Sequence, residues 1–495
     1  MRLFNSLIPV ALIALVLFMG FYNLGGDMMN DDEGTYLYGA WRASLGEVPY
    51  RDFFVVQMPL SIYLTAGLFR LFGPEVWLAR AVSFLLLLGT GFLIYGTSIK
   101  FFGFSRNLSL AIAGLFLLTK HVYFLGRIFM PDSYMIFFCA AALYFALKAE
   151  HRAPVIQQKW AMFLFGIFSG LAVLAKFNGI LLFGGYLVYS IFLLVRKMEK
   201  PRDLLQNILV SSAGFLLTFG LIYGLLLIFV PGTYQATLGY HLAKENAATG
   251  MAAFPFLRLG QFVGNHNYGL ISIALIGIFF GTVFKERKRA LLLFTTVAFL
   301  SLSFVPGKFY LRYIVFALVP LTFFFGDGIR LIGSKKGLRL FAFPVVIALV
   351  LLSLGPTFNL EKLLAYDNGT RTLASYIREE TMPGDYVFGD DQGINFYAQR
   401  PCPPRLADVS EATTSSGQVT SVDIRNECDQ YNVKLIFVEK GASAHHLRNL
   451  RDYPLFENYL NERYEFIKTI RRQFLDVDIY RRKLHSSKIA LIKLI

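Results

Sequence analysis

The sequence has few charged residues and very few cysteines for its length of 495 residues. Asp, Glu, Lys and Arg together make up 16% of the chain, whereas hydrophobic residues make up 55%. A chain of this size with so little polar surface is excluded from the class of soluble proteins. The three cysteines, Cys139, Cys402 and Cys428, are too few for a disulfide-dense scaffold and leave open one pairing, Cys402 with Cys428.

Three kinds of sequence signal are also missing. No small-residue cleavage site of the A-x-A type follows the first apolar run, so we expect that run to be retained, with a cleaved signal peptide as the alternative. No Gly-rich phosphate loop of the P-loop kind is present, which excludes that mode of nucleotide binding. No internal repeat is evident, and this argues against a transporter built from two paired halves.

Long apolar runs, together with 50 phenylalanines, are what the sequence does contain. About 20 helical residues cross the hydrocarbon core of a bilayer, and shorter runs extend through their flanks. Eleven runs approach this length, at 7–23, 77–99, 108–126, 133–148, 161–176, 180–195, 207–230, 267–283, 291–305, 312–326 and 341–356. The expected fold class is therefore a polytopic α-helical membrane protein with about eleven transmembrane helices.

The distribution of Lys and Arg predicts how these helices are oriented. The loops after spans 2, 4, 6, 8 and 10 carry 17 basic residues: Lys100, Arg106, Lys148, Arg152, Lys159, Arg196, Lys197, Lys200, Arg202, Lys285, Arg287, Lys288, Arg289, Arg330, Lys335, Lys336 and Arg339. The positive-inside rule assigns such loops to the cytoplasm, where they contact anionic lipid headgroups. The net charge of +15 is thereby explained by a multi-pass protein of the cytoplasmic membrane, and a nucleic-acid partner is not expected.

Two regions of different composition follow from this pattern. Residues 1–356 form the expected transmembrane domain, with helices at 35–45 and 60–72 lying in the membrane interface within the first outer loop, 25–75. Residues 357–495 lack long apolar runs and predict a soluble, extracytoplasmic α/β domain. Its expected helices are at 370–380, 421–431 and 445–462, and its expected strands are at 385–389, 434–438 and 464–482.

Charged residues at the predicted outer ends of the spans are the candidates for a functional site. Asp31, Asp32 and Glu33 follow the first span, and Asp132 lies in the turn between spans 3 and 4. Five basic residues depart from the positive-inside rule: Lys120, Arg127, Lys176, Lys308 and Arg312. Charges at this depth are costly and tend to be functional. The alternatives are solvated helix ends for the acids, helix capping for Asp132, and snorkelling for each cation.

Three segments carry a resemblance to a known family. They are DDEGTYLYGAWRASLGEVPYRDFFVVQMPLSIYLTAGLFRLFG after the first span, GRIFMPDSYMIFF in the second outer loop, and GKFYLRYIVFALVPL late in the membrane domain. In order and topology they resemble the polyprenyl-phosphate-dependent glycosyltransferases of the GT-C fold, which include protein O-mannosyltransferases and the aminoarabinose transferases of lipid A. The membrane domain, 1–356, would then be a GT-C-like catalytic domain.

The resemblance implies an inverting transfer of a sugar from a polyprenyl-phosphate carrier to a protein, lipid or glycan acceptor at the outer face of the membrane. Asp32, with Asp31 as the competing candidate, would act on the acceptor as the base, and Glu33 and Asp132 complete the catalytic set. The residues expected to bind the donor phosphate are Arg127, Lys176, Lys308, Tyr310 and Arg312.

A divalent metal ion is left open as a cofactor. Some relatives have a Glu before a Pro-Pro-Leu element, but here the segment reads Gln57-Met58-Pro59-Leu60. The weak candidates for metal ligands are Asp32, Asp132, His241 and His266, with Asp52 as a further outer-loop acid. The alternative functions are a non-catalytic membrane scaffold and a transporter of lipid-linked glycans.

The predicted topology is tested by cysteine labelling from outside the cell, with Ser443→Cys and Ser334→Cys introduced separately in a background free of native cysteines. We expect a membrane-impermeant reagent to label position 443 and not position 334, because the basic loop at 334–339 is assigned to the cytoplasm. Labelling of position 334 alone would reverse the orientation.

Overall fold

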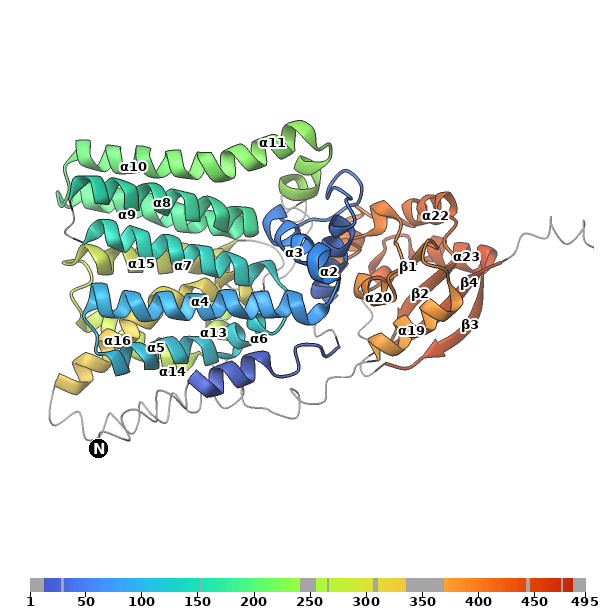
Figure 1. Ribbon diagram of the computed structural model, residues 1–495, viewed down its shortest axis with the longest axis horizontal. Helices are drawn as coiled ribbons and strands as arrows, with labels where there is room; N and C mark the ends of the chain where they lie inside the picture. The colour runs from blue at the N-terminus through green and yellow to red at the C-terminus, as the bar shows by residue number, and fades with distance from the viewer. Residues whose placement is uncertain are drawn as a thin grey trace, which may run out of the picture.

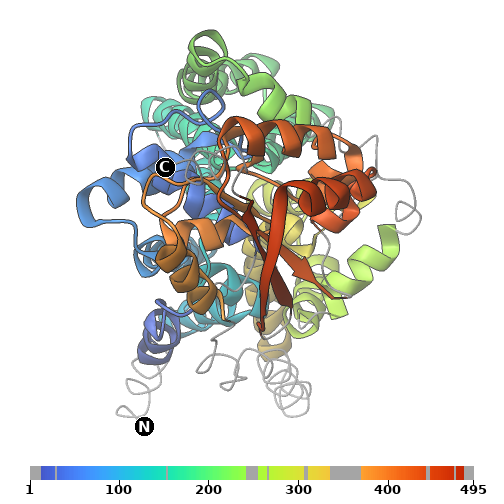
Figure 2. The ribbon, with the colours of Figure 1, turned by 90° about the vertical axis from the view of Figure 1, so that its right-hand side faces the viewer.

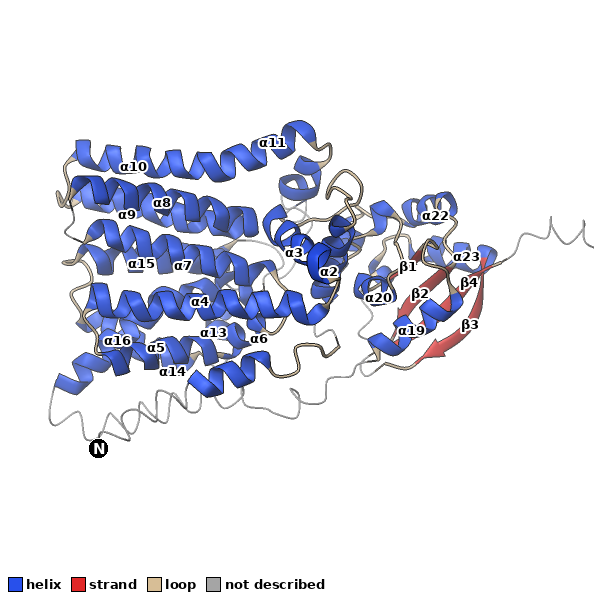
Figure 3. Ribbon diagram, viewed as in Figure 1, coloured by secondary structure: helices blue, strands red, loops and turns tan. Residues whose placement is uncertain are grey.

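The computed structural model describes residues 13–27, 31–151, 154–240, 255–264, 267–305, 310–334, 369–441, 446–472 and 475–483. A bundle of long helices forms one end of the molecule, and a smaller part containing all the described strands forms the other (Figures 1 and 3). Helices α2 (Asp31–Ser44) and α3 (Pro59–Phe72) lie between the two parts (Figure 1). The sequence thus separates into an apolar helical part and a mixed α/β part.

The bundle consists of helices with the apolar composition that the sequence predicts. Its elements are α4 (Val76–Phe102), α5 (Arg106–Leu118), α6 (Lys120–Gly126), α7 (Pro131–Glu150), α8 (Val155–Ala175), η1 (Phe177–Gly179), α9 (Ile180–Val195), α10 (Pro201–Phe215), η2 (Leu216–Gly220), α11 (Leu221–Phe229), η3 (Gln235–Gly239), α13 (Pro255–Gly264), α14 (Tyr268–Phe280), α15 (Arg287–Leu300), η5 (Ser301–Phe304), η6 (Leu311–Ala317) and α16 (Leu318–Ser334). A further helix covers 13–21.

By length and composition, six helices of the described part are able to cross a membrane, or up to eight if each of two bent pairs counts as one span. The first bent pair is α5 with α6, which meet at 69° within the run predicted as span 3. The predicted run 341–356 lies outside the described residues, and 7–23 lies partly outside them. The polytopic helical class is confirmed, and the count of eleven stays a prediction.

Small residues allow neighbouring helices of the bundle to approach closely. A Cβ atom added to Gly166 of α8 would lie 1.9 Å from the Ser211 carbonyl oxygen of α10, and one added to Gly214 would lie 2.2 Å from the Phe163 carbonyl oxygen. In a membrane, where apolar burial between helices contributes little, such close backbone contact is a main source of packing energy. The glycines in these apolar runs therefore determine which helix faces meet.

The basic loops assigned to one side of the membrane do meet at one end of the bundle. Arg287, Lys288, Arg289 and Arg330 join these loops by ion pairs and hydrogen bonds to carbonyl groups at helix ends. The contacts are Arg287 with Glu150 and Glu199, Lys288 with His151 and the Phe101 carbonyl, Arg289 with Asp327, and Arg330 with the carbonyls of Phe102 and Gly103. All five predicted basic loops contribute, so the alternation of the spans is consistent with this packing.

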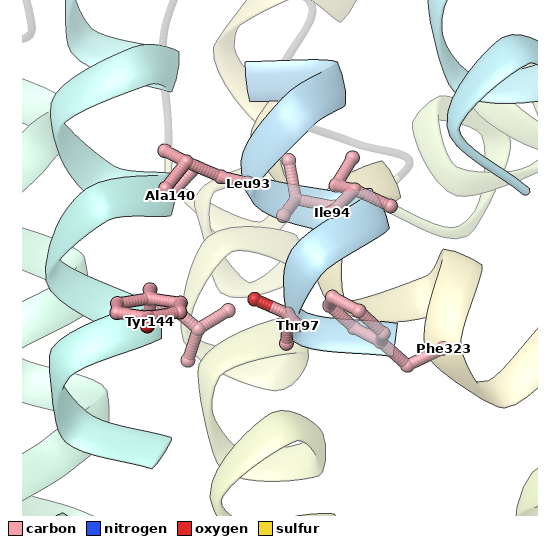
Figure 4. Close-up of a pocket in the computed structure, with 8 residues that line it drawn as sticks. Leu93, Ile94, Thr97, Ala140, Tyr144 and Phe323 are labelled. Atoms are coloured by element: carbon pink, nitrogen blue, oxygen red, sulfur yellow. The ribbon is translucent and has the colours of Figure 1, made fainter. Parts of the chain in front are cut away.

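A small cavity lies between α4, α7 and α16 (Figure 4). The side chains around it are mostly apolar, and its volume is about 10 Å³, room for one water molecule at most. The lining residues are Leu93, Ile94, Thr97, Ala140, Leu143, Tyr144, Val319 and Phe323. We regard it as a packing gap rather than a ligand site.

The two helices of the first outer loop differ from the prediction in one informative respect. Helix α3 begins at Pro59, close to the predicted start, and exposes Leu71 and Phe72 at its end, as an interfacial helix would. Helix α2, however, begins at Asp31 and not near residue 35. The three acidic residues therefore occupy its first turn, where the free N–H groups and the helix dipole favour negative charge. The three acidic residues are therefore part of helix α2 and do not lie in the segment that precedes it.

Residues 369–483 form a four-stranded sheet with helices around it (Figure 2). The strand order is β1 (Val387–Gly389), β2 (Leu435–Lys440), β4 (Asp476–Arg482), β3 (Tyr464–Ile470). Strands β1 and β2 are parallel, whereas β4 is antiparallel to both β2 and β3. The connecting elements are α20 (Gln392–Ala398), η8 (Pro404–Leu406), α21 (Glu411–Ser416), α22 (Ser421–Gln430), η9 (Leu447–Asn449) and α23 (Tyr453–Arg463), preceded by α19 (Thr370–Glu380).

Most elements expected in this part of the sequence agree with those observed. The predicted helices at 370–380 and 421–431 are α19 and α22, and the strand residues expected at 464–482 form the hairpin β3–β4. The helix expected at 445–462 needs correction, because α23 begins only at Tyr453, after the short η9. The boundary expected at residue 356 lies outside the described residues. Cys402 and Cys428 are both buried free thiols, so the pairing left open by the sequence is not formed in this structure.

Candidate active site

Two ion pairs meet at the end of the bundle that faces α2. The first joins Asp32, in the first turn of α2, to Arg312, in the first turn of η6. Arg312 Nη2 lies 2.5 Å from Asp32 Oδ2, although the two residues are 280 positions apart in the sequence. The Asp32 side chain keeps 39% of its surface exposed and that of Arg312 keeps 18%. This carboxylate is therefore accessible to a ligand from outside.

The second ion pair joins Lys176 and Asp132. Lys176 follows the last residue of α8, and its Nζ lies 2.6 Å from Asp132 Oδ1. Asp132 is the second residue of α7, which Pro131 begins, and it has no exposed surface. Since Asp132 is fully buried, it is suited to holding Lys176 in place and not to contacting a substrate.

Aromatic rings connect the two pairs. The Lys176 ammonium lies 4.9 Å from the centroid of the Tyr313 ring, and the Arg312 guanidinium lies 4.5 Å from that of Tyr310 and 6.0 Å from that of Tyr313. Such cation–π contacts fix the direction of each cation. We call the six residues Asp32, Asp132, Lys176, Tyr310, Arg312 and Tyr313 the ion-pair cluster.

The electrostatic state of Asp32 follows from its neighbours. Burial acts to raise the pKa of the Asp32 carboxyl, but the charge and hydrogen bond of Arg312 outweigh it and hold the pKa below its ordinary value. Lys176 and His446, the latter from the C-terminal part, lower it further. Tyr36, one turn along α2, has its pKa raised by burial and by Asp32, so it remains a neutral hydroxyl. Asp32 is therefore an ionised carboxylate beside the neutral hydroxyl of Tyr36.

Two polar atoms of the cluster lack a hydrogen-bond partner among the described residues. Arg312 Nε and Asp132 Oδ2 are buried, and neither finds one. Buried donors and acceptors in native proteins are nearly always satisfied, by protein, water or ligand. The cluster thus has hydrogen-bonding capacity left over for a further polar group.

Glu33 lies outside the cluster, and its predicted catalytic role needs correction. Its carboxylate receives hydrogen bonds from Arg80 Nε and Nη2, each at 2.7 Å, and from the Phe129 backbone N–H at 2.8 Å. The side chains of Glu33 and Arg80 have no exposed surface. Arg80 also donates to the carbonyls of Leu24, Gly26 and Asp27. Glu33 therefore anchors α2 to α4 and does not reach a substrate.

Arg127 also lies apart from the cluster, contrary to its expected role in phosphate binding. It is 2% exposed, and its Nη1 donates to the Met19 carbonyl at 2.7 Å. Met19 belongs to the helix over 13–21, so Arg127 satisfies a carbonyl near the end of the first apolar run. The sequence gave no sign of this backbone partner.

Several other residues expected at the phosphate site or at a metal site do not belong to the ion-pair cluster. Lys308, His241, His266 and the side chain of Asp31 lie outside the described part of the structure. Asp52 pairs with Arg51 and accepts a hydrogen bond from the Val48 N–H within a local turn. Within the described ranges, no group of three or more His, Cys, Asp or Glu side chains could hold a metal ion. Asp32 and Asp132 each contact a protein cation instead, so the described residues do not fit a metal site.

Part of the chain is similar in sequence to a known family. Residues 55–240 match the sequence model of a family described as dolichyl-phosphate-mannose-protein mannosyltransferase, and the matched range includes Asp132 and Lys176. No protein of curated function matches the chain in sequence.

Two groups of solved structures share the fold. ArnT from Cupriavidus metallidurans, bound to undecaprenyl phosphate, superposes with a TM-score of 0.68 at 17% sequence identity, over 95% of this chain and 97% of that chain. The oligosaccharyltransferase AglB from Archaeoglobus fulgidus, in complex with an inhibitory peptide and a dolichol-phosphate, has a TM-score of 0.55 at 13% identity, over 94% of this chain and 73% of that chain. The chain has the GT-C fold, and the resemblance expected from its sequence is confirmed.

The buried pair of Glu33 and Arg80 is tested by Glu33→Gln, which keeps the size of the side chain but removes its charge. We expect a loss of about 3–5 kcal/mol in stability, because Arg80 is left buried without a counter-charge. The readout is the apparent melting temperature in detergent. The control is Glu75→Gln, since Glu75 is exposed just before α4. Equal melting temperatures for the two variants would contradict the anchoring role.

The pair of Asp32 and Arg312 is tested by the pH dependence of stability in Arg312→Gln. The lowered pKa of Asp32 means that its ionised form stabilises the fold above the unfolded-state pKa, and that this contribution is lost as the pH falls. Without Arg312, burial dominates and raises that pKa, so the stability deficit of the variant should shrink from pH 7 towards pH 4. The double variant Asp32→Asn/Arg312→Gln should show a deficit independent of pH. A deficit in Arg312→Gln that does not change with pH would contradict the assignment.

Proposed function

We propose that this chain is a membrane glycosyltransferase that transfers a sugar from a polyprenyl-phosphate carrier to an acceptor at the outer face of the membrane, with inversion at the anomeric carbon. The observation that carries the proposal is an accessible carboxylate, Asp32, paired with an arginine that has an unsatisfied N–H. A carboxylate provides a base, and a guanidinium with free hydrogen-bonding capacity provides a phosphate site.

The comparisons support this class of donor. The family matched by residues 55–240 is described by its use of dolichyl-phosphate mannose, and two structures of the same fold hold undecaprenyl phosphate and a dolichol-phosphate. In the present chain, Arg312 and Lys176 are the cations that would receive such a phosphate. Lys308 stands four positions before Arg312 in the sequence and is the third candidate.

The ion pair of Asp32 and Arg312 also suggests how donor binding prepares the base. While Arg312 is paired with Asp32, it holds the carboxyl pKa low and makes Asp32 a weak base. A donor phosphate that takes hydrogen bonds from Arg312 competes with Asp32 for the same guanidinium. The pKa of Asp32 then rises, and the carboxylate becomes a stronger base only when donor is present. Because the donor would bind before Asp32 becomes a stronger base, an acceptor would not lose its proton in the absence of donor.

The transfer step forms one bond at the anomeric carbon and breaks another. The acceptor oxygen or nitrogen forms a bond to the anomeric carbon, and its proton passes to the Asp32 carboxylate. The bond from that carbon to the phosphate oxygen breaks on the opposite face, and polyprenyl phosphate leaves with the electron pair. Arg312 and Lys176 stabilise the charge that develops on the leaving phosphate. Asp132 keeps the Lys176 ammonium beside the Tyr313 ring.

The proposal is tested with purified protein and a panel of labelled polyprenyl-phosphate sugars, with wild type, Asp32→Asn and Asp52→Asn compared. Asp52 is a matched control because it is an acid of the same outer loop whose partners are local. We expect at least one donor to be consumed by wild type and by Asp52→Asn, and turnover by Asp32→Asn to fall by about 10²-fold or more. Near-normal turnover by a well-folded Asp32→Asn protein would remove Asp32 as the base.

A further inference from the structure

Helix α2 lies between the bundle and the C-terminal part, residues 369–483 (Figure 1). Asp32 lies in its first turn, while Arg312 belongs to the bundle. Whether the two residues meet therefore depends on where α2 is placed. A helix of 14 residues has little stability of its own in water, so its position must come from its contacts.

One close backbone contact joins α2 to α20. A Cβ atom added to Gly34 would lie 2.7 Å from both the Cα and the backbone N of Gly393, and 2.9 Å from Asp391 Oδ1. Asp391 caps α20 by accepting a hydrogen bond from the Gly393 N–H. Backbone therefore meets backbone at this point, two residues after Asp32, and no side chain of any size fits between them.

A second contact fixes the segment just before α2. Arg371 of α19 pairs with Asp27 at 3.2 Å and donates to the Gly25 carbonyl, and Tyr397 of α20 donates to the Gly26 carbonyl at 3.3 Å. On the other side, Arg80 of the bundle donates to the carbonyls of Gly26 and Asp27. The same few peptide groups are thus bound from both parts of the molecule.

A third set of contacts fixes the remainder of the first outer loop. The Tyr38 hydroxyl accepts a hydrogen bond from the Cys402 N–H at 2.8 Å, and the Val56 N–H donates to Asp408 Oδ2 at 3.0 Å. The ring of Phe69 in α3 stacks on that of Phe396, with centroids 5.8 Å apart. The C-terminal part therefore contacts the loop before, along and after α2.

We propose that the C-terminal part is a positioning element of the active site, which acts through Gly34 and Arg371 to hold α2 where Asp32 meets Arg312. This rests on the proposed function for its catalytic consequence, but not for its structural claim. Arg312 belongs to η6 and Lys176 follows α8, both elements of the bundle, so loosening the contact of α2 with the C-terminal part moves the base relative to these two cations. Misplacement of a reacting group by about 1 Å can cost as much as 10²-fold in rate.

Two matched pairs of variants test this inference. Gly34→Ala introduces a Cβ that collides with backbone, whereas Gly39→Ala in the same helix meets only side-chain carbons, at 3.5 Å or more. Arg371→Ala removes the contact to residues 25–27, whereas Arg378→Ala in the same helix removes only a bond to Ser375. Arg371→Lys restores the charge and should recover most of the effect. Since Arg371 is more than half exposed, its variants are expected to fold.

The first readout does not depend on activity. Asp32→Cys is introduced into each background, and the rate of its reaction with a negatively charged thiol reagent is measured. The three native cysteines are buried and contribute little. We expect labelling to be at least about threefold slower with Gly34→Ala or Arg371→Ala, because the thiol then lies farther from the Arg312 guanidinium, which favours the thiolate and attracts the anionic reagent. Labelling should be unchanged with Gly39→Ala, Arg378→Ala or Arg371→Lys. Equal labelling rates in all backgrounds would overturn the inference, whether or not the protein transfers sugar.

The second readout is the kinetics of transfer with Asp32 intact. We expect kcat to fall about tenfold or more in Gly34→Ala and Arg371→Ala, while the KM for the donor stays within about twofold. A rise in KM with kcat unchanged would overturn the positioning role. Absence of transfer by wild type would count against the proposed function alone, because the labelling rates would still decide the structural claim.

Discussion

The contact between Asp32 and Arg312 is the interaction on which the site depends. It joins helix α2 of the first outer loop to the bundle, between residues 280 positions apart in the sequence. The contact therefore requires α2 to keep a fixed position relative to the bundle. Charges are costly near the membrane boundary unless they are paired, which explains why each cation of the ion-pair cluster contacts a carboxylate. Because Asp32 is partly exposed whereas Asp132 is fully buried, the two similar pairs have different chemical capacities.

Buried arginines provide much of the scaffold for this contact. Arg80 binds Glu33 and three carbonyls, and Arg127 binds a carbonyl of the first apolar helix, so both stabilise the chain leading into α2. At the opposite end of the bundle, Lys288 and Arg330 bind carbonyls at the end of α4 in the same manner. Basic residues in this protein therefore do more than determine topology, because they also satisfy the backbone groups that helix ends leave unpaired.

The helices and part of the candidate site could be predicted from the sequence. The prediction succeeded where a residue type commonly has a single role. Apolar periodicity located the long helices, and charge at outer boundaries pointed to Asp32, Asp132, Lys176 and Arg312, which the structure brings together. The same rule failed for Glu33 and Arg127, because sequence does not reveal that Arg80 or a carbonyl is the partner. The packing of α20 against α2 could not be predicted from the sequence either, because it depends on two glycines 359 positions apart.

The central claim is that the donor phosphate replaces Asp32 as the partner of Arg312. The most direct test is a structure of the wild-type protein, determined by electron microscopy with polyprenyl phosphate bound. We predict that the phosphate contacts the Arg312 guanidinium and that Asp32 and Arg312 separate beyond about 4 Å, the usual limit for an ion pair. A phosphate bound elsewhere, with the two side chains still 2.5 Å apart, would contradict the account.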